Sequence, residues 1–218
     1  MGRGGIPLKR LAVFDFDGTL IKGDSIVRYI LYAVAKGHLS PFNIPFQLIN
    51  VYKTLTKRIT NEEGKSNALA FLGRMSKTEQ EAFNADFCMM KLIPHIYKMG
   101  IERMKKHRRQ GDLVLLLSAS PESYMQHLLG LLPVDGVLAS PTDTQGRVSV
   151  TTRHHEKVRR LQCFTQGLEI DWPNSWAYGD SAADLPVMRL TGHPVLVNPK
   201  PAMLKEGKGL PVEMWLLS

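Results

Sequence analysis

The run Asp15-Phe16-Asp17-Gly18-Thr19 constrains this chain most, because it directly follows the apolar segment 11–14. Side chains two residues apart in a strand point to the same side, so Asp15 and Asp17 place two carboxylates together where a buried strand meets a loop. Like charges repel each other and are costly to bury. The pattern therefore predicts a strand end at which a cation or a reactive group relieves the repulsion.

Further apolar runs predict a buried parallel sheet. Segments 11–14, 113–117, 176–178 and 195–197 have the length and composition of buried strands, and a weaker run at 136–139 predicts a fifth. Helical patterns separate most of them, which favours an α/β fold, a Rossmann-like parallel sheet covered by helices. Ligands bind beyond the carboxyl ends of strands in such sheets, so we expect the polar residues that follow these runs to form one site.

The long segment between the first two predicted strands is helical in pattern throughout. We predict a separate helical cap domain at 22–94, inserted into a core domain formed by 1–21 and 95–218. Its helices are expected over 25–36, with Asp24 as the N-cap, over 46–58, and after capping boxes at Thr60 and Ser76. Tyr29, Phe46 and Phe71 are expected in the core of this cap. A helix over 94–109 then returns to the core domain.

The charge balance indicates anionic partners without choosing among them. The chain has 28 basic and 20 acidic residues, a formal charge of +8. The basic cluster 105–109 resembles a nucleic-acid patch, but a solvated helix end explains it better, so no nucleic acid is expected. The two cysteines lack metal-ligand spacing, and residues 1–5 lack the apolar stretch of a signal peptide. We therefore expect a cytoplasmic protein.

Three further elements complete a candidate site around Asp15 and Asp17. Ser118 ends the second strand run, and Ser120-Pro121-Glu122 predicts a helix start with Ser120 as N-cap. Lys157 lies at the start of another predicted helix. Gly179-Asp180-Ser181-Ala182-Ala183-Asp184 follows a strand, and Pro186 places the next helix start near Asp184. Hard carboxylate oxygens in a phosphate-sized site suit Mg2+, and a hydroxyl and a lysine suit phosphoryl oxygens.

These motifs, in this order, resemble those of the haloacid dehalogenase superfamily of phosphohydrolases. The helical insert after the first motif is similar to the cap of its phosphoserine-phosphatase-like branch, subfamily IB. The resemblance implies that Asp15 is the nucleophile of an aspartyl-phosphate mechanism and that Asp17 is the general acid and base. It further implies Mg2+ ligands at Asp15, Asp17, Asp180 and Asp184, and contacts to substrate or phosphate from Gly18, Thr19, Asp24, Ser118, Ala119 and Lys157.

The resemblance fixes the reaction and not the substrate, which we expect to be a small phosphorylated metabolite. Phosphoserine phosphatases carry a glutamate where Asp24 stands here, and a cap arginine that grips the substrate carboxylate. Segment 60–72 contains Lys65 and no arginine, and lysine is a poorer partner for a carboxylate. Phosphoserine is therefore a candidate that the sequence does not favour.

Other functions remain open at this point. Some relatives are similar to phosphatidylglycerophosphate phosphatases, and the apolar segment 42–55, flanked by Lys53, Lys57 and Arg58, fits an interfacial helix on anionic lipid. A cap helix packed on its neighbours is favoured, because the polar residues Asn43, Gln47 and Asn50 interrupt the run. A phosphotransferase or a non-catalytic anion-binding protein are the remaining alternatives, and the sequence does not set the oligomeric state.

Overall fold

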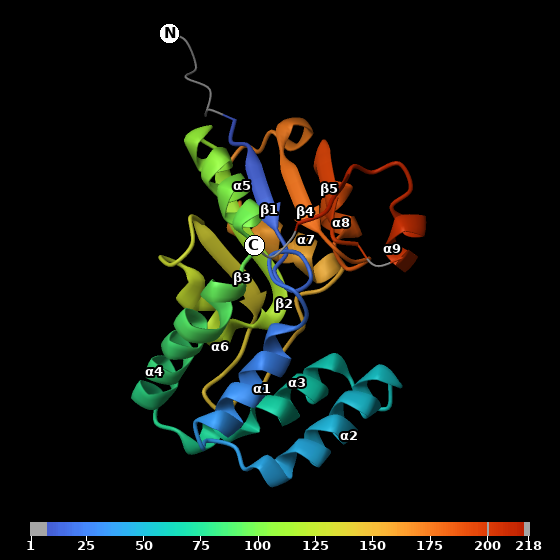
Figure 1. Ribbon diagram of the computed structural model, residues 1–218. Coiled ribbons are helices and arrows are strands. Elements are labelled where there is room, and N and C mark those ends of the chain that lie inside the picture. The colour runs from blue at the N-terminus through green and yellow to red at the C-terminus, as the bar shows by residue number, and fades with distance from the viewer. Residues whose placement is uncertain (1–7, 200, 216–218) are drawn as a thin grey trace.

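The computed structural model describes residues 8–199 and 201–215, which form a six-stranded parallel sheet with strand order β3-β2-β1-β4-β5-β6 (Figure 1). The predicted α/β fold and its five strand runs are confirmed, and a sixth edge strand was not predicted. Residues 1–7, which include the segment used above to argue against a signal peptide, lie outside the described part. The strands are β1 (Leu11–Phe14), β2 (Leu113–Pro121), β3 (Gly136–Ser140), β4 (Trp176–Gly179), β5 (His193–Val197) and β6 (Val212–Glu213).

The central strand β1 shows how the sheet is covered on both faces. Ala12 and Phe14 belong to one hydrophobic cluster, together with Met104 of α5 (Lys98–Arg109). Leu11 and Val13 belong to a second cluster, which includes residues of α7 (His155–Phe164) and α8 (Leu185–Met188). Because side chains alternate along a strand, Asp15 continues the side of Leu11 and Val13, toward α7.

Residues 22–94 form a group of helices, and α1 to α3 lie beyond the carboxyl end of the sheet (Figure 1). The expected caps at Asp24, Thr60 and Ser76 all bind the first turn of their helices. The helices are α1 (Ser25–Ala35), α2 (Ile44–Leu55), α3 (Asn61–Leu69) and α4 (Lys77–Phe87), with short turns at Pro41–Asn43, Ala70–Arg74 and Cys88–Leu92. The division into core and cap domains stays a prediction.

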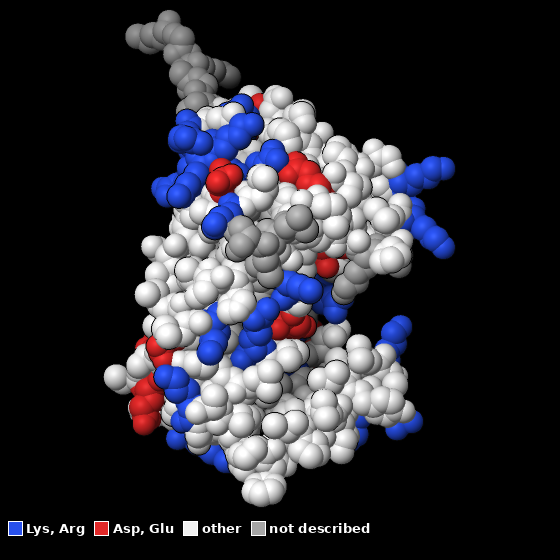
Figure 2. All heavy atoms as spheres, viewed as in Figure 1, with Lys and Arg blue, Asp and Glu red and all other residues white. Residues whose placement is uncertain are grey.

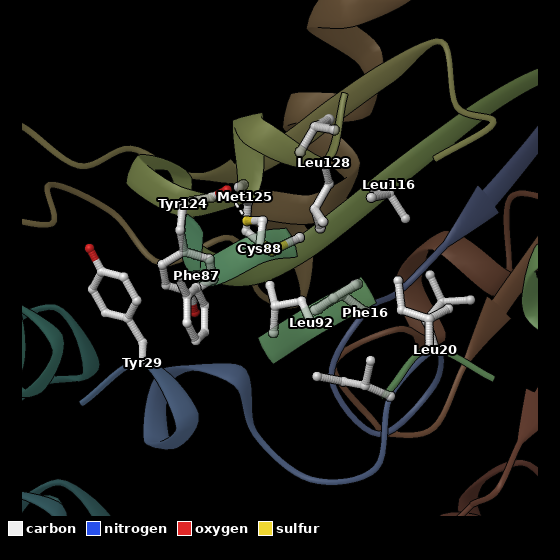
Figure 3. Packing of buried hydrophobic residues seen from close by; sticks show 14 of the residues in the cluster. Phe16, Leu20, Tyr29, Phe87, Cys88, Leu92, Leu116, Tyr124, Met125 and Leu128 are labelled. Atoms are coloured by element: carbon white, nitrogen blue, oxygen red, sulfur yellow. Dashed lines mark hydrogen bonds between the residues drawn. The ribbon is translucent and has the colours of Figure 1, made fainter. Parts of the chain in front are cut away.

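Helix α1 is anchored to the sheet side by an aromatic cluster (Figure 3). The ring of Tyr29 lies 4.8 Å from that of Phe87 and 4.7 Å from that of Tyr124, in α6 (Glu122–Met125). The thiol of Cys88 donates to the carbonyl of Tyr124 at 3.1 Å. These contacts hold the first turn of α1 beside the end of β2. Tyr29 and Phe71 are buried as expected, but Phe46 is 53% exposed, so its placement in the core was wrong.

Several local predictions need correction. The helix returning to the core begins at Lys98 and not at residue 94, because Pro94 belongs to the 3-10 turn Ile93–His95. The run Thr144-Gln145-Gly146-Arg147 also favours a hairpin over 144–150 with its turn at Gln145-Gly146. The structure has instead a single antiparallel bridge, Thr142 to Val148, closed by a turn. The remaining short helices are 3-10 segments at Gln126–Leu128 and Trp172–Asn174, and α9 (Pro201–Glu206).

The basic end of α5 is only in part a solvated surface. His107 is buried and lies between the Asp112 carboxylate at 2.8 Å and the Tyr178 hydroxyl at 2.9 Å. A cavity of about 210 Å³ lies beside it, at the amino ends of the strands, and is lined in part by Lys106 and Trp176. This cavity is at the opposite end of the sheet from Asp15. Among the residues described, none of the helices combines the length and hydrophobicity needed to cross a bilayer.

Candidate active site

Asp15 lies where β1 ends, and it is buried. Its backbone N–H donates to the Tyr178 carbonyl on β4 at 2.9 Å, which fixes the end of the strand. One carboxylate oxygen accepts from Lys157 Nζ at 2.6 Å and the other from the Thr19 hydroxyl at 3.2 Å. Burial raises the pKa of Asp15, against the opposing effect of the Lys157 charge.

Asp17 is held by residues that sequence reasoning missed. Its carboxylate accepts from the Ser25 N–H at 2.6 Å, from the Ser25 hydroxyl at 3.1 Å and from the Ser120 hydroxyl. The Ser25 hydroxyl also contacts those of Ser120 and Tyr124, each at 2.8 Å. Burial raises the pKa of Asp17 to about 6, and the charge of Asp24 adds to the rise. The expected role of Ser120 as an N-cap was therefore wrong.

Ser120 does not cap a helix because β2 is longer than predicted. The strand continues to Pro121, so Ser120 is still in extended backbone and its side chain faces Asp17. Helix α6 begins after Pro121 without a side-chain cap, and it has only four residues. The helix N-terminus expected beside Ser118 is therefore short. The Ser118 hydroxyl is fully buried and accepts from the Ser120 N–H at 3.0 Å.

Three buried carboxylates meet at the ends of β1 and β4. Asp15, Asp180 and Asp184 each offer an oxygen, and these three atoms lie within 4.8 Å of one another. Gly18 permits the approach, since a Cβ there would lie 2.3 Å from Asp180 Oδ2 and its φ is +83°. Asp184 does not cap α8 with its side chain; it accepts from the Ser181 N–H and hydroxyl at 3.2 and 3.0 Å.

Lys157 is the buried cation of this group. Its ammonium donates to Asp15 at 2.6 Å and to Asp184 at 2.5 Å. Burial works against its charge, but the two carboxylates outweigh burial and raise the pKa of Lys157 above its ordinary value. The first turn of α7 supplies this residue, as the sequence predicted. The arrangement therefore holds negative and positive charge together among buried residues.

Two residues of the insert, Asp24 and Lys65, lie near Asp17. Asp24 is exposed, and its carboxylate caps α1 by accepting from the Ile26 N–H at 3.0 Å. Lys65 on α3 donates to the Ala119 carbonyl on β2, and so links the insert to the core. Burial lowers the pKa of Lys65 to about 8, although the charges of Asp24 and Asp17 favour its protonation. Both residues are close enough to Asp17 for their charges to act on it.

Comparison with known families and proteins agrees with this geometry. Residues 12–189 match the model of the haloacid dehalogenase-like hydrolase family. The chain is 31% identical to a histidinol-phosphatase of Neisseria meningitidis serogroup C, over 94% of this chain and 98% of that protein. It is 27% identical to a phosphoserine phosphatase of Mycobacterium tuberculosis, over 89% of this chain and 66% of that protein.

Solved structures show the same fold at lower sequence identity. A Bordetella pertussis protein of unknown function matches with a TM-score of 0.84 and 21% identity, over 94% of this chain and 98% of its own. A substrate-bound phosphoserine phosphatase matches with a TM-score of 0.65 and 18% identity, over 95% of this chain and 94% of its own. The chain therefore shares its overall fold with these structures.

Proposed function

This chain belongs to the haloacid dehalogenase-like hydrolase family, and on that premise we propose that it hydrolyses small phosphomonoesters through a phosphorylated Asp15. The observation that carries the proposal is the buried group of Asp15, Asp180 and Asp184, in which the ammonium of Lys157 pairs with Asp15 and Asp184. Family membership establishes a hydrolase, and this group supplies a buried carboxylate with a cation to support attack on phosphorus.

The reaction has two displacements at phosphorus. A carboxylate oxygen of Asp15 attacks, a bond from phosphorus to that oxygen forms, and the ester bond to the leaving oxygen breaks. Water then attacks phosphorus, the bond to Asp15 breaks, and inorganic phosphate leaves. Lys157 and Thr19 hold the two carboxylate oxygens of Asp15 in place, which keeps the nucleophile oriented through both steps.

Asp17 moves the protons. In the first displacement it gives its proton to the leaving oxygen, and in the second it takes a proton from the attacking water. A pKa near 6 suits a group that must both give and take a proton near neutral pH. The hydrogen bonds from Ser25 and Ser120 orient its carboxylate toward that task.

The three carboxylates of Asp15, Asp180 and Asp184 fit Mg2+. Their donors are hard oxygens, they converge within 4.8 Å, and all three residues are buried. Asp15, Asp180 and Asp184 would hold the ion directly or through water, with the backbone carbonyl of Asp17 as a further ligand. When bound, Mg2+ supplies positive charge that offsets the negative charge of the transferring group.

Residues of β2 and of the loop after β1, together with Lys157 of α7, bind the phosphoryl oxygens in this proposal. Lys157 supplies positive charge, and Ser118 supplies a hydroxyl near the carboxyl end of β2. The backbone at Gly18, Thr19 and Ala119 supplies further polar groups. These loops lie at the carboxyl ends of neighbouring parallel strands, which is where such sheets bind ligands.

We propose a phosphorylated amino alcohol as substrate, with histidinol phosphate as the first candidate. One relative, a histidinol-phosphatase, aligns with 94% of this chain and 98% of its own length. The residues of the insert support an amine substrate. The Asp24 carboxylate suits a substrate amine, and segment 60–72 offers no arginine for a substrate carboxylate. Phosphoserine is the second candidate, supported by the mycobacterial relative.

The test is a comparison of kcat/KM with Mg2+ for three substrates: L-histidinol phosphate, O-phospho-L-serine and glycerol 3-phosphate. We expect the two amines to exceed glycerol phosphate and histidinol phosphate to exceed phosphoserine. Asp24→Asn lowers the preference for the two amines over glycerol 3-phosphate, measured as a ratio of kcat/KM within the same variant. Equal kcat/KM for all three substrates would refute the assignment of substrate class without touching the reaction itself.

A further inference from the structure

Helix α2 exposes its apolar side chains and turns a mainly polar face toward the protein, the reverse of an ordinary amphipathic helix. Its apolar side chains face away from the protein: Phe42 just before it is 93% exposed, Leu48 is 65% exposed and Leu55 is 78% exposed. Phe46, Ile49, Val51 and Tyr52 are about half exposed as well. Helices of globular proteins normally bury such a stripe, and contiguous exposed apolar patches mark interaction sites.

The face that α2 turns toward the protein is polar. Asn50 is its only buried residue; Gln47 and Thr54 are partly buried, as is Ile44 in its first turn. Asn50 donates to the Gly64 carbonyl on α3 at 2.7 Å and accepts from Asn67 at 3.2 Å. Residues 47, 50 and 54 follow helical spacing, so they form one stripe. The polar residues that were expected to disfavour an interfacial helix are thus the ones that attach it to α3.

The charged residues of α2 and of the turns beside it have one sign. Segment 37–61 contains no Asp or Glu, while Lys53, Lys57 and Arg58 lie at or just beyond the end of α2. Figure 2 shows the surface in the region of α2 as mostly uncharged, with Lys and Arg side chains at its edge. Figure 1 places the helix on the side of the insert remote from the sheet. An apolar face edged by cations, on an outer helix, is the pattern of helices that lie in a membrane interface.

We propose that α2, with the turn at Phe42, is a docking surface for an anionic lipid bilayer. The apolar side chains enter the headgroup boundary and the three cations contact lipid phosphates. The helix lies on the membrane; its 12 residues cannot span one. The face lies on the side of the insert remote from the sheet (Figure 1), so docking does not require the catalytic group to contact lipid.

A second copy of this chain fits the same face less well. A symmetric pair brings two identical basic helix ends toward one shared interface, with no acidic residue in segment 37–61 to offset them. Phe42 projects as an exposed tip before the helix, which suits insertion into a fluid boundary. The overall charge of +8 also favours an anionic surface over a copy of equal charge.

The experiment is flotation of the full chain with vesicles of phosphatidylcholine alone or mixed with phosphatidylglycerol. The test variant is Leu48→Gln/Leu55→Gln, and the matched control replaces two exposed apolar residues outside α2, Met90→Gln/Leu129→Gln. A third variant, Lys53→Gln/Lys57→Gln, tests the charge. Phosphate release from p-nitrophenyl phosphate by each variant shows that the fold and the catalytic group are intact, separately from binding.

We expect binding to the anionic vesicles, a roughly tenfold lower partition coefficient for Leu48→Gln/Leu55→Gln, and no change for the control. Added salt and the lysine variant weaken binding further. No binding of the unaltered chain to anionic vesicles would overturn the proposal, as would equal binding of the test and control variants. A dimer in light scattering that dissociates in Leu48→Gln/Leu55→Gln, without vesicle binding, would assign the face to a second copy instead.

Discussion

Ser25 donates two hydrogen bonds to the carboxylate of Asp17, one from its backbone N–H at 2.6 Å and one from its hydroxyl at 3.1 Å. Ser25 is the first residue of α1, the first helix after the Asp15–Thr19 loop, while Asp17 belongs to that loop itself. The aromatic contacts of Tyr29 hold this helix in place. The position of the proposed proton donor therefore depends on how α1 packs.

Ser25→Ala tests this dependence. The variant keeps the backbone contact but loses the hydroxyl that joins Asp17, Ser120 and Tyr124. We expect kcat to fall roughly tenfold with little change in KM, because a hydrogen bond to a charged group is lost from the orienting set and not from substrate binding. Steady-state kinetics measures the split. Ser40→Ala, a change in the exposed cap before Phe42, should leave kcat as it is; an unchanged kcat in both variants would remove Ser25 from the account.

Gly18 and Gly23 form a matched pair of glycines. Both have positive φ, +83° and +84°, but only at Gly18 does a Cβ meet another group, Asp180 Oδ2 at 2.3 Å. Gly18→Ala and Gly23→Ala should each cost about 1 kcal/mol of stability from backbone strain. Only Gly18→Ala should also raise the Mg2+ concentration needed for half-maximal activity, and lower kcat/KM on the order of a hundredfold. Similar activity losses in the two variants would argue against the close approach of Gly18 to Asp180.

The lowered pKa of Lys65 predicts that the free energy of unfolding depends on pH. Burial lowers its pKa in the folded chain to about 8, below the value near 10.5 of an exposed lysine. Between these two values the unfolded chain binds more protons, so the free energy of unfolding rises with pH in that window. We expect the stability of the unaltered chain relative to Lys65→Met to rise by about 2 kcal/mol from about pH 7 to about pH 10. Urea unfolding at both pH values measures it, and a relative stability that stays flat or falls would contradict the lowered pKa.

The variant Lys157→Met distinguishes stabilisation of the carboxylates by Mg2+ from their stabilisation by the Lys157 charge. The variant leaves the carboxylates of Asp15 and Asp184 without the cation that pairs them, which should cost about 3 to 5 kcal/mol. Mg2+ relieves the same repulsion, so added Mg2+ should raise the Tm of Lys157→Met more than that of the unaltered chain. The double variant Lys157→Met/Asp180→Asn is the control, since it lacks one ligand. An equal Tm rise in all three proteins would mean that the ion binds elsewhere.

The sequence predicted the parts of the site that follow from strand ends. Asp15, Ser118 and Asp180 come directly after or at the end of apolar runs, so parallel pairing alone brings them to one edge of the sheet. The place of Lys157 at the start of a helix was predicted from local pattern, and the first turn of α7 contains it. The short edge strand β6 was missed because two residues carry too little periodicity to be recognised.

What escaped prediction depends on tertiary contacts. Ser120 fits a helix cap locally, but its partner Asp17 lies 103 residues away, and the continued extension of β2 decides the outcome. In α2 the polar stripe was visible, yet periodicity fixes only that two faces differ. Which face turns inward was settled by the Asn50 bonds to α3 and by its close approach at Gly64, where a Cβ would lie 2.3 Å from Thr54 Oγ1.

The central claim is that Asp15 carries the phosphoryl group. Rapid acid quenching of the unaltered chain with labelled substrate and Mg2+, followed by mapping of the labelled peptide, tests it most directly. We predict label on the peptide that contains Asp15, and neither label nor phosphate release in Asp15→Asn. Label on another residue, or phosphate release by Asp15→Asn at a rate near that of the unaltered chain, would contradict it.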